Sequence, residues 1–167
     1  MLRDRGARCV LGNHDVGLLS PHGERARNAP GVAQGLVAWL ADQPLSIEMM
    51  LAGTRLLMTH ASPCAPHTQY VHAHSPELRR IAEVEADVVV IGHTHAQLVQ
   101  RVGRPLVVNP GSVGQARDRS NGKRLSYAVL DPATGEVRID DYLVGDGRPD
   151  EPAHAGTGTA TGEVDRS

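Results

Sequence analysis

The chain shows a recurrent pattern in which a short aliphatic run ends in a cluster of polar residues. Runs that are rich in Val, Ile and Leu and are bounded by Gly or Pro are typical of buried strands. Four such strands are predicted, at residues 7–11, 55–59, 87–91 and 105–108. The polar clusters that follow them read GNHD, HASP, GHTH and NPGSVG. Each predicted strand therefore ends in side chains that can bind a ligand.

Two further regions have the pattern of antiparallel hairpins. Residues 46–59 form two strand-like segments that turn at the sequence AGT. Residues 124–131 and 136–144 alternate more regularly between apolar and polar positions, and the turn sequence PATG joins them. Alternating segments on either side of a short Gly-containing turn predict a hairpin.

Helical spacing of apolar residues occurs in two places. Residues 32–43 predict a helix that Pro44 stops. Residues 75–85 predict a second helix, with Ser75 as the N-cap and Pro76 at the first helical position. This helix leads directly into a predicted strand. The elements together predict a mixed α/β domain.

The length of 167 residues suits one domain. We assign this domain to residues 1–144. Residues 145–167 consist of Gly, Thr, Pro and acidic residues with almost no apolar side chains, and predict a disordered tail.

Composition narrows the class of protein. The net charge of −2 and the absence of a basic stripe argue against a nucleic-acid binder. Aromatic residues make up 2% of the chain and Phe is absent, so the core is expected to be aliphatic. The sequence has no apolar run of 18 residues, no signal peptide and only two cysteines, which predicts a cytoplasmic protein without a membrane span.

Four of the nine histidines, His14, His60, His93 and His95, lie in the polar clusters after the predicted strands. In open α/β sheets, ligands bind outside the carboxyl ends of the strands. Imidazole, amide and carboxylate groups that meet at such an edge suit a transition metal such as Mn, Fe, Co, Ni or Zn. Taken singly, each cluster also has an ordinary interpretation, because Asn and Asp are common turn residues and a lone histidine after a strand is more often a surface or hydrogen-bonded residue than a ligand.

GNHD, a strand that ends in His60, GHTH and NPGSVG occur in the order found in the calcineurin-like metallophosphoesterase superfamily, which this chain resembles over about residues 8–144. It looks most like the small bacterial and archaeal phosphodiesterase and phosphatase branch. The resemblance implies a two-sheet β-sandwich flanked by helices, with two metal ions at the strand ends. It further implies that a metal-bridging hydroxide hydrolyses a small phosphomonoester or phosphodiester.

The resemblance also assigns roles to individual residues. Asn13, His60 and His93 would bind the second metal ion, and His95 would bind the first. His14 would stabilise or protonate the leaving-group oxygen, and Asp15 would orient its imidazole. Manganese is the expected metal, with iron, nickel, cobalt or zinc as alternatives. A second H-x-H pair, His72 and His74, is interpreted as part of the surface or of the substrate rim, which loops 17–31 and 61–76 are expected to form.

Two motifs of the family, D-x-H and G-D, are not found where the family has them, N-terminal to GNHD. The one G-D pair, Gly145-Asp146, lies in the predicted tail and is rejected as a metal ligand. We therefore expect a family member that is truncated at its N-terminus, lacks the first β-α-β-α unit of the fold, and is impaired in hydrolysis. The alternatives are a non-catalytic metal-binding or interaction module derived from the fold, completion of the site by a partner chain, and a purely structural α/β domain. The oligomeric state stays open.

Overall fold

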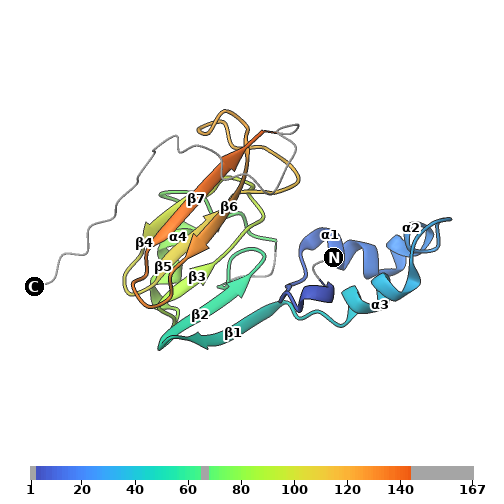
Figure 1. The fold of residues 1–167 in the computed structure, drawn as a ribbon, viewed down its shortest axis with the longest axis horizontal. Helices are drawn as coiled ribbons and strands as arrows, with labels where there is room; N and C mark the ends of the chain where they lie inside the picture. The colour runs from blue at the N-terminus through green and yellow to red at the C-terminus, as the bar shows by residue number, and fades with distance from the viewer. Residues whose placement is uncertain (1–2, 65–67, 144–167) are drawn as a thin grey trace, which may run out of the picture.

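The computed structural model describes residues 3–64 and 68–143, so the predicted tail at 145–167 lies outside the described residues. The predicted mixed α/β fold is confirmed, with a five-stranded sheet, a two-stranded sheet and flanking helices (Figure 1). The elements in chain order are η1 (Arg3–Arg5), α1 (Asn13–Leu19), η2 (Pro21–Gly23), α2 (Glu24–Arg27), α3 (Gln34–Ala41), β1 (Ser46–Leu51), β2 (Thr54–Thr59), α4 (Pro76–Arg80), η3 (Ile81–Glu83), β3 (Val88–Val90), β4 (Gln97–Arg101), β5 (Leu106–Pro110), β6 (Leu125–Leu130) and β7 (Val137–Tyr142).

The larger sheet has the strand order β1-β2-β3-β5-β4. The three central strands, β2, β3 and β5, run parallel, and β1 and β4 join them antiparallel at the two edges. Three of the four predicted aliphatic strands therefore lie side by side. Because they are parallel, the residues that follow them emerge at one edge of the sheet.

The prediction of a fourth strand at residues 7–11 is wrong. This segment has no strand conformation, and its one backbone hydrogen bond joins Leu11 N to the carbonyl oxygen of Pro44. A strand requires a neighbouring strand with which to form a ladder, and none of the described strands pairs with residues 7–11. The polar cluster GNHD consequently does not end a strand: Asn13 begins the helix α1.

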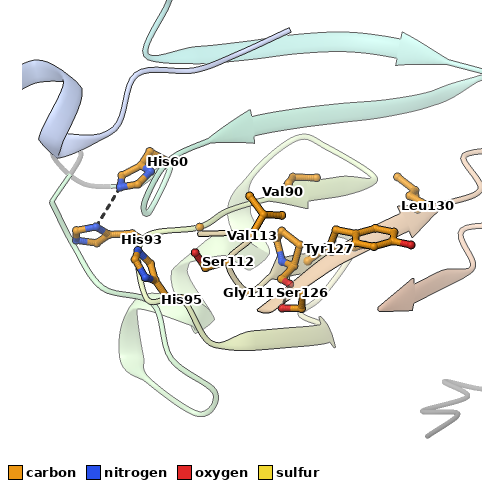
Figure 2. A pocket seen from close by; sticks show the side chains of 14 residues that line it. His60, Val90, His93, His95, Gly111, Ser112, Val113, Ser126, Tyr127 and Leu130 are labelled. Atoms are coloured by element: carbon orange, nitrogen blue, oxygen red, sulfur yellow. Dashed lines mark hydrogen bonds between the residues drawn. The ribbon is translucent and has the colours of Figure 1, made fainter. Parts of the chain in front are cut away.

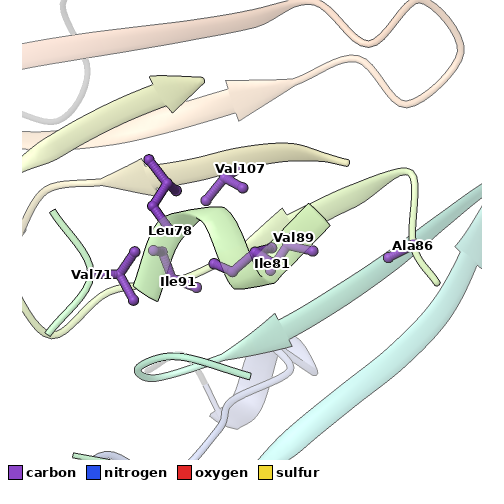
Figure 3. Close-up of a cluster of buried hydrophobic side chains, with 7 residues drawn as sticks. All are labelled: Val71, Leu78, Ile81, Ala86, Val89, Ile91 and Val107. Atoms are coloured by element: carbon purple, nitrogen blue, oxygen red, sulfur yellow. The ribbon is translucent and has the colours of Figure 1, made fainter. Parts of the chain in front are cut away.

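The core lies on both faces of the central strands. One face of β3 and β5 packs against α4 and η3, which contribute the buried side chains of Leu78 and Ile81 (Figure 3). On the opposite face, Val88 and Val108 pack against the two-stranded sheet. Full burial of one such aliphatic side chain stabilises the fold by about 1.5–3 kcal/mol. The result is three layers, with the larger sheet in the middle.

Local signals in the sequence explain the turns and caps. Ala52 and Gly53 both have positive φ angles, of 48° and 87°, as a two-residue type I′ hairpin turn requires. The predicted N-cap of α4 is also confirmed, because the Ser75 hydroxyl accepts a hydrogen bond from Leu78 N at 3.2 Å. The predicted late hairpin is formed by β6 and β7.

The helices α1, α2 and α3 lie together beyond the ends of β1 and β2, to one side of both sheets (Figure 1). None of these helices has a fully buried residue. The helix predicted at residues 32–43 is observed as Gln34–Ala41. Among the described residues, no helix is long and apolar enough to cross a membrane.

Candidate metal centre

Three segments that are distant in the sequence meet at the carboxyl edge of the larger sheet. They are the start of α1, the residue after β2 and the turn after β3. The Nε2 atom of His60 lies 2.9 Å from Asn13 Oδ1 and 3.1 Å from His93 Nδ1. The two imidazoles approach each other edge to face, with 4.9 Å between ring centroids (Figure 2). The structure thus brings together three of the four predicted metal ligands.

Gly12 allows this close approach. A Cβ atom at residue 12 would lie 2.9 Å from ring atoms of His60, which is too close for any other residue without a shift of the ring. The Gly12 N–H donates to Asp15 Oδ2 at 2.8 Å, so the carboxylate closes the first turn of α1. Within the described residues, no hydrogen bond joins Asp15 to the exposed side chain of His14. The orienting role of Asp15 stays a prediction.

Backbone carbonyls fix the tautomers of two histidines. His93 Nε2 lies 3.2 Å from Thr68 O, and His95 Nδ1 lies 3.0 Å from Gln115 O. A carbonyl oxygen only accepts hydrogen bonds, so each of these nitrogens carries a proton in the neutral ring. The other nitrogen of each ring then presents a lone pair. Histidines that bind metals have the same arrangement, in which the second nitrogen donates to a carbonyl or carboxylate.

The donor atoms of this trio fit a divalent cation. His60 Nε2 faces two acceptors, the amide oxygen of Asn13 and the lone pair of His93 Nδ1, and a single N–H can satisfy only one of them well. In octahedral coordination, donor atoms about 2.1 Å from the metal ion and at right angles to one another lie about 3.0 Å apart. The observed separations of 2.9 and 3.1 Å match this spacing. The two separations are therefore compatible with one metal ion at Asn13, His60 and His93, and the role of these residues as ligands stays a prediction.

The electrostatics of the trio favour neutral imidazoles. Burial lowers the pKa of His60, and the neighbouring His93 lowers it further. Burial also lowers the pKa of His93. The hydrogen bond to Thr68 O raises this pKa, but burial has the larger effect. Neutral rings keep the lone pairs that a metal ion needs.

The fourth predicted metal ligand, His95, does not join the trio of Asn13, His60 and His93. His95 lies in the same GHTH turn as His93, between β3 and β4, but it makes its hydrogen bond to Gln115 O and not to the trio (Figure 2). Within residues 3–64 and 68–143, no group of three or more His, Cys, Asp or Glu side chains is placed to hold a metal ion. The trio consists of neutral ligands alone.

The GHTH turn is held in an unusual backbone conformation. His93 and His95 have positive φ angles of 68° and 58°, which cost a non-glycine residue about 1–3 kcal/mol each. The fully buried side chain of Asn109 holds this turn, because its amide donates to Gly92 O at 2.8 Å and to Thr94 Oγ1 at 2.9 Å. Asn109 therefore shapes the turn that presents the histidines.

Several residues of the centre carry no signal that identifies them in the sequence. The carbonyls of Thr68 and Gln115 act through the backbone, so their side chains give no indication of the role. Asp118, in the loop after β5, accepts bonds from Gln97 N at 2.7 Å and Ser120 N at 2.8 Å. The only indication of this loop in the sequence is that it continues the NPGSVG motif.

A cavity of about 470 Å³ extends from the histidines into the space between the two sheets (Figure 2). His60, His93 and His95 form its polar end. Apolar side chains, including Val90, Val108 and Leu130, form most of the remainder, together with Ser112, Ser126 and Tyr127. The arrangement can hold a charged group at the histidines and an apolar group between the sheets.

The fold is that of the metallophosphoesterases. The crystal structure of a metallophosphoesterase from Sphaerobacter thermophilus matches with a TM-score of 0.57 at 23% identity, covering 79% of this chain and 64% of that one. The family model of the calcineurin-like phosphoesterase superfamily domain matches residues 2–135. The chain belongs to this superfamily, whose members use divalent metals.

Two curated relatives are longer than this chain. The uncharacterized protein MJ0912 of Methanocaldococcus jannaschii is 26% identical over 165 residues, covering 83% of this chain and 66% of the relative. The symmetrical bis(5'-nucleosyl)-tetraphosphatase of Paracidovorax citrulli is 40% identical over 89 residues, covering 47% of this chain and 30% of the relative. The chain thus spans less than two thirds of the length of either relative.

Proposed function

We propose that this chain takes part in the metal-dependent hydrolysis of a small phosphoester. The observation that carries the proposal is the convergence of Asn13 Oδ1, His60 Nε2 and His93 Nδ1 at separations of 2.9 and 3.1 Å. Membership of the phosphoesterase superfamily supports the reaction class. The net charge of −2 favours a small substrate over a nucleic acid.

In this proposal, some residues of the chain bind metal ions and others donate a proton. Asn13, His60 and His93 hold one divalent ion, preferably manganese, with iron, cobalt, nickel or zinc as alternatives, and His95 contributes to a second. Bound divalent metal supplies an activated water and polarises the phosphoryl oxygens. His14, exposed at the start of α1, donates a proton at the leaving-group oxygen, and Asp15 supports it.

We also propose a cytoplasmic location, on the basis of the low cysteine content.

We propose that hydrolysis by this chain is slow. The trio of Asn13, His60 and His93 contains no carboxylate to offset the charge of two dications. The neutral ligands still suffice for one ion. The second candidate function, a non-catalytic metal-binding module, rests on the same neutral trio.

Manganese binding by the full chain, measured by calorimetry, tests the proposal. We expect one site that is lost in Asn13→Ala, His60→Ala and His93→Ala and is retained in His22→Ala, a change at an exposed histidine away from the trio. We also expect slow, manganese-dependent hydrolysis of bis-p-nitrophenyl phosphate that His93→Ala abolishes.

The outcomes separate the candidates. Binding without hydrolysis selects the non-catalytic module. Absence of binding with both manganese and zinc in excess overturns both functions, as does hydrolysis that persists in His93→Ala.

A further inference from the structure

An exposed aromatic side chain lies directly on the candidate metal centre. The ring of Tyr70 stacks on the ring of His93, with 3.9 Å between centroids and 26° between planes. In spite of this contact, Tyr70 is 50% exposed. The chain contains four aromatic residues, namely one Trp, three Tyr and no Phe. One of these few rings therefore stands in solvent beside the centre.

A second ring continues the arrangement. The imidazole of His72 is parallel to the ring of Tyr70, with 4° between planes and 6.2 Å between centroids. His72 is exposed. Together the two side chains, Tyr70 and His72, form a ring platform beside His93.

The loop that carries the ring platform is anchored on both sides of it. Val71, between the two rings, is 3% exposed and packs into the core beneath α4. Thr68 O accepts from the His93 ring at 3.2 Å, and His72 O accepts from Ser75 N at 3.1 Å. Because Val71 is held inward, its two neighbours are turned outward together.

We propose that the ring platform binds a planar aromatic group carried by the phosphoester substrate. Stacking on Tyr70 requires a flat, polarisable group, and the contact between Tyr70 and His93 places such a group next to a phosphate held at the trio. A nucleobase and an aryl group share this chemistry. The proposal rests on the proposed function, since it names the substrate class of the same site.

The ring platform also has a purely structural interpretation, in which Tyr70 only covers His93. Tyr70→Leu separates the two, because leucine keeps an apolar cover on His93 but has no planar ring. Tyr70→Phe keeps the ring and loses the hydroxyl. His74→Asn is the matched control for His72→Leu, because His74 is exposed on the same loop and Asn tolerates its φ of 65°.

The test is calorimetric binding, with manganese present, of three ligands: ribose 5-phosphate without an aromatic ring, AMP with a nucleobase, and phenyl phosphate with an aryl ring. Stacking of one ring on an aromatic side chain is worth about tenfold in affinity. We expect AMP or phenyl phosphate, or both, to bind about tenfold more tightly than ribose 5-phosphate. This advantage is expected to remain in Tyr70→Phe and His74→Asn, to decrease in His72→Leu and to disappear in Tyr70→Leu. The preferred ligand identifies the group as a base or an aryl ring.

Adenosine, which has no phosphate, separates this inference from the proposed function. If adenosine shifts the NMR resonances of the Tyr70 ring while ribose 5-phosphate does not bind, the ring platform stands and the phosphoesterase site fails. If all three phosphates bind equally, or if the advantage of the aromatic ligands survives in Tyr70→Leu, the ring platform is overturned and the phosphoesterase site is untouched. No response of Tyr70 to adenosine, AMP or phenyl phosphate also overturns it.

Discussion

Gly12 and His60 illustrate how a single missing side chain can position a candidate ligand. The ring of His60 occupies the space that a Cβ at residue 12 would need, and Asn13 follows at once with its amide oxygen 2.9 Å from the same ring. The φ of Gly12 is −96°, which any residue adopts. The requirement for glycine here is therefore one of space and not of backbone conformation.

Gly12→Ala is expected to weaken manganese binding about tenfold, the lower end of the range for groups that orient metal ligands. The added methyl group displaces the His60 ring, and calorimetric titration measures the loss. Gly17→Ala is the control, since nothing lies within 4 Å of a Cβ at residue 17 and alanine favours the helix α1. Equal affinity in the two variants would show that the ring of His60 tolerates the contact.

Asn109→Asp is expected to lower the free energy of unfolding by about 2–4 kcal/mol. The substitution preserves size but replaces the amide donor to Gly92 O and Thr94 Oγ1 with an acceptor, in a side chain that is 0% exposed. Each lost buried partner costs about 1–3 kcal/mol. Urea denaturation measures the change, with Asn28→Asp at an exposed position as the control. A difference below 0.5 kcal/mol, on the order of a surface substitution, would contradict the role of Asn109 in the turn.

At the scale of elements, the sequence predicts the helices and strands that a local pattern of apolar residues determines. The aliphatic runs of β2, β3 and β5 were expected as buried strands, and the meeting of His60 and His93 followed from their parallel order. The segment at 7–11 has a similar aliphatic pattern but no neighbouring strand. Pattern alone does not reveal the absence of a partner, so this prediction failed.

The hydrogen bonds that position His95 depend on the three-dimensional path of the loop after β5. The bond from His95 to Gln115 O requires the loop after β5 to fold back over the sheet edge. Asp118 secures that loop, because its carboxylate accepts from the first residue of β4 and from Ser120. Such long-range contacts leave no periodic signal in the sequence, which is why they were not predicted.

Asp118 makes the stability of this loop dependent on pH. Burial raises the pKa of its carboxyl group, but the hydrogen bonds from Ser120, Gln97 N and Asn121 N outweigh burial and leave the pKa below the ordinary value of 3.8. A carboxyl whose folded pKa is depressed contributes its full stability above the unfolded pKa and loses it as the pH falls through the folded pKa. The contribution of Asp118 is therefore present at neutral pH and is lost progressively as the pH falls from about 4 through the lowered folded pKa.

Asp118→Asn is expected to lower the free energy of unfolding at pH 7 by about 1–3 kcal/mol, the range for hydrogen bonds to a charged group. The variant and the wild type should converge as the pH falls from about 4 through the lowered pKa of Asp118, where the wild-type carboxyl becomes protonated. Urea denaturation at a series of pH values measures this, with Asp42→Asn as an exposed control. A constant difference between variant and wild type across the whole pH range would contradict the assignment.

At the scale of the whole molecule, the core and the candidate centre occupy different parts of the same sheet. Leu78 and Ile81 pack on one face of β3 and β5, while the histidines follow the strands at the carboxyl edge. The buried cluster around Leu78 supports the strands but contributes no ligand. Stability and metal binding should therefore respond separately to substitution of this core.

Leu78→Ala tests this separation. Leu78 is 1% exposed, so its truncation leaves a cavity between α4 and the sheet and should lower the free energy of unfolding by about 2–5 kcal/mol. Leu45→Ala, at a side chain that is 37% exposed, should cost much less. At a temperature where both variants are folded, manganese affinity should equal that of the wild type, because β2 and β3 still set the positions of His60 and His93. A loss of affinity in Leu78→Ala that matches its loss of stability would instead mean that the packing of α4 and the geometry of the histidines form one cooperative unit.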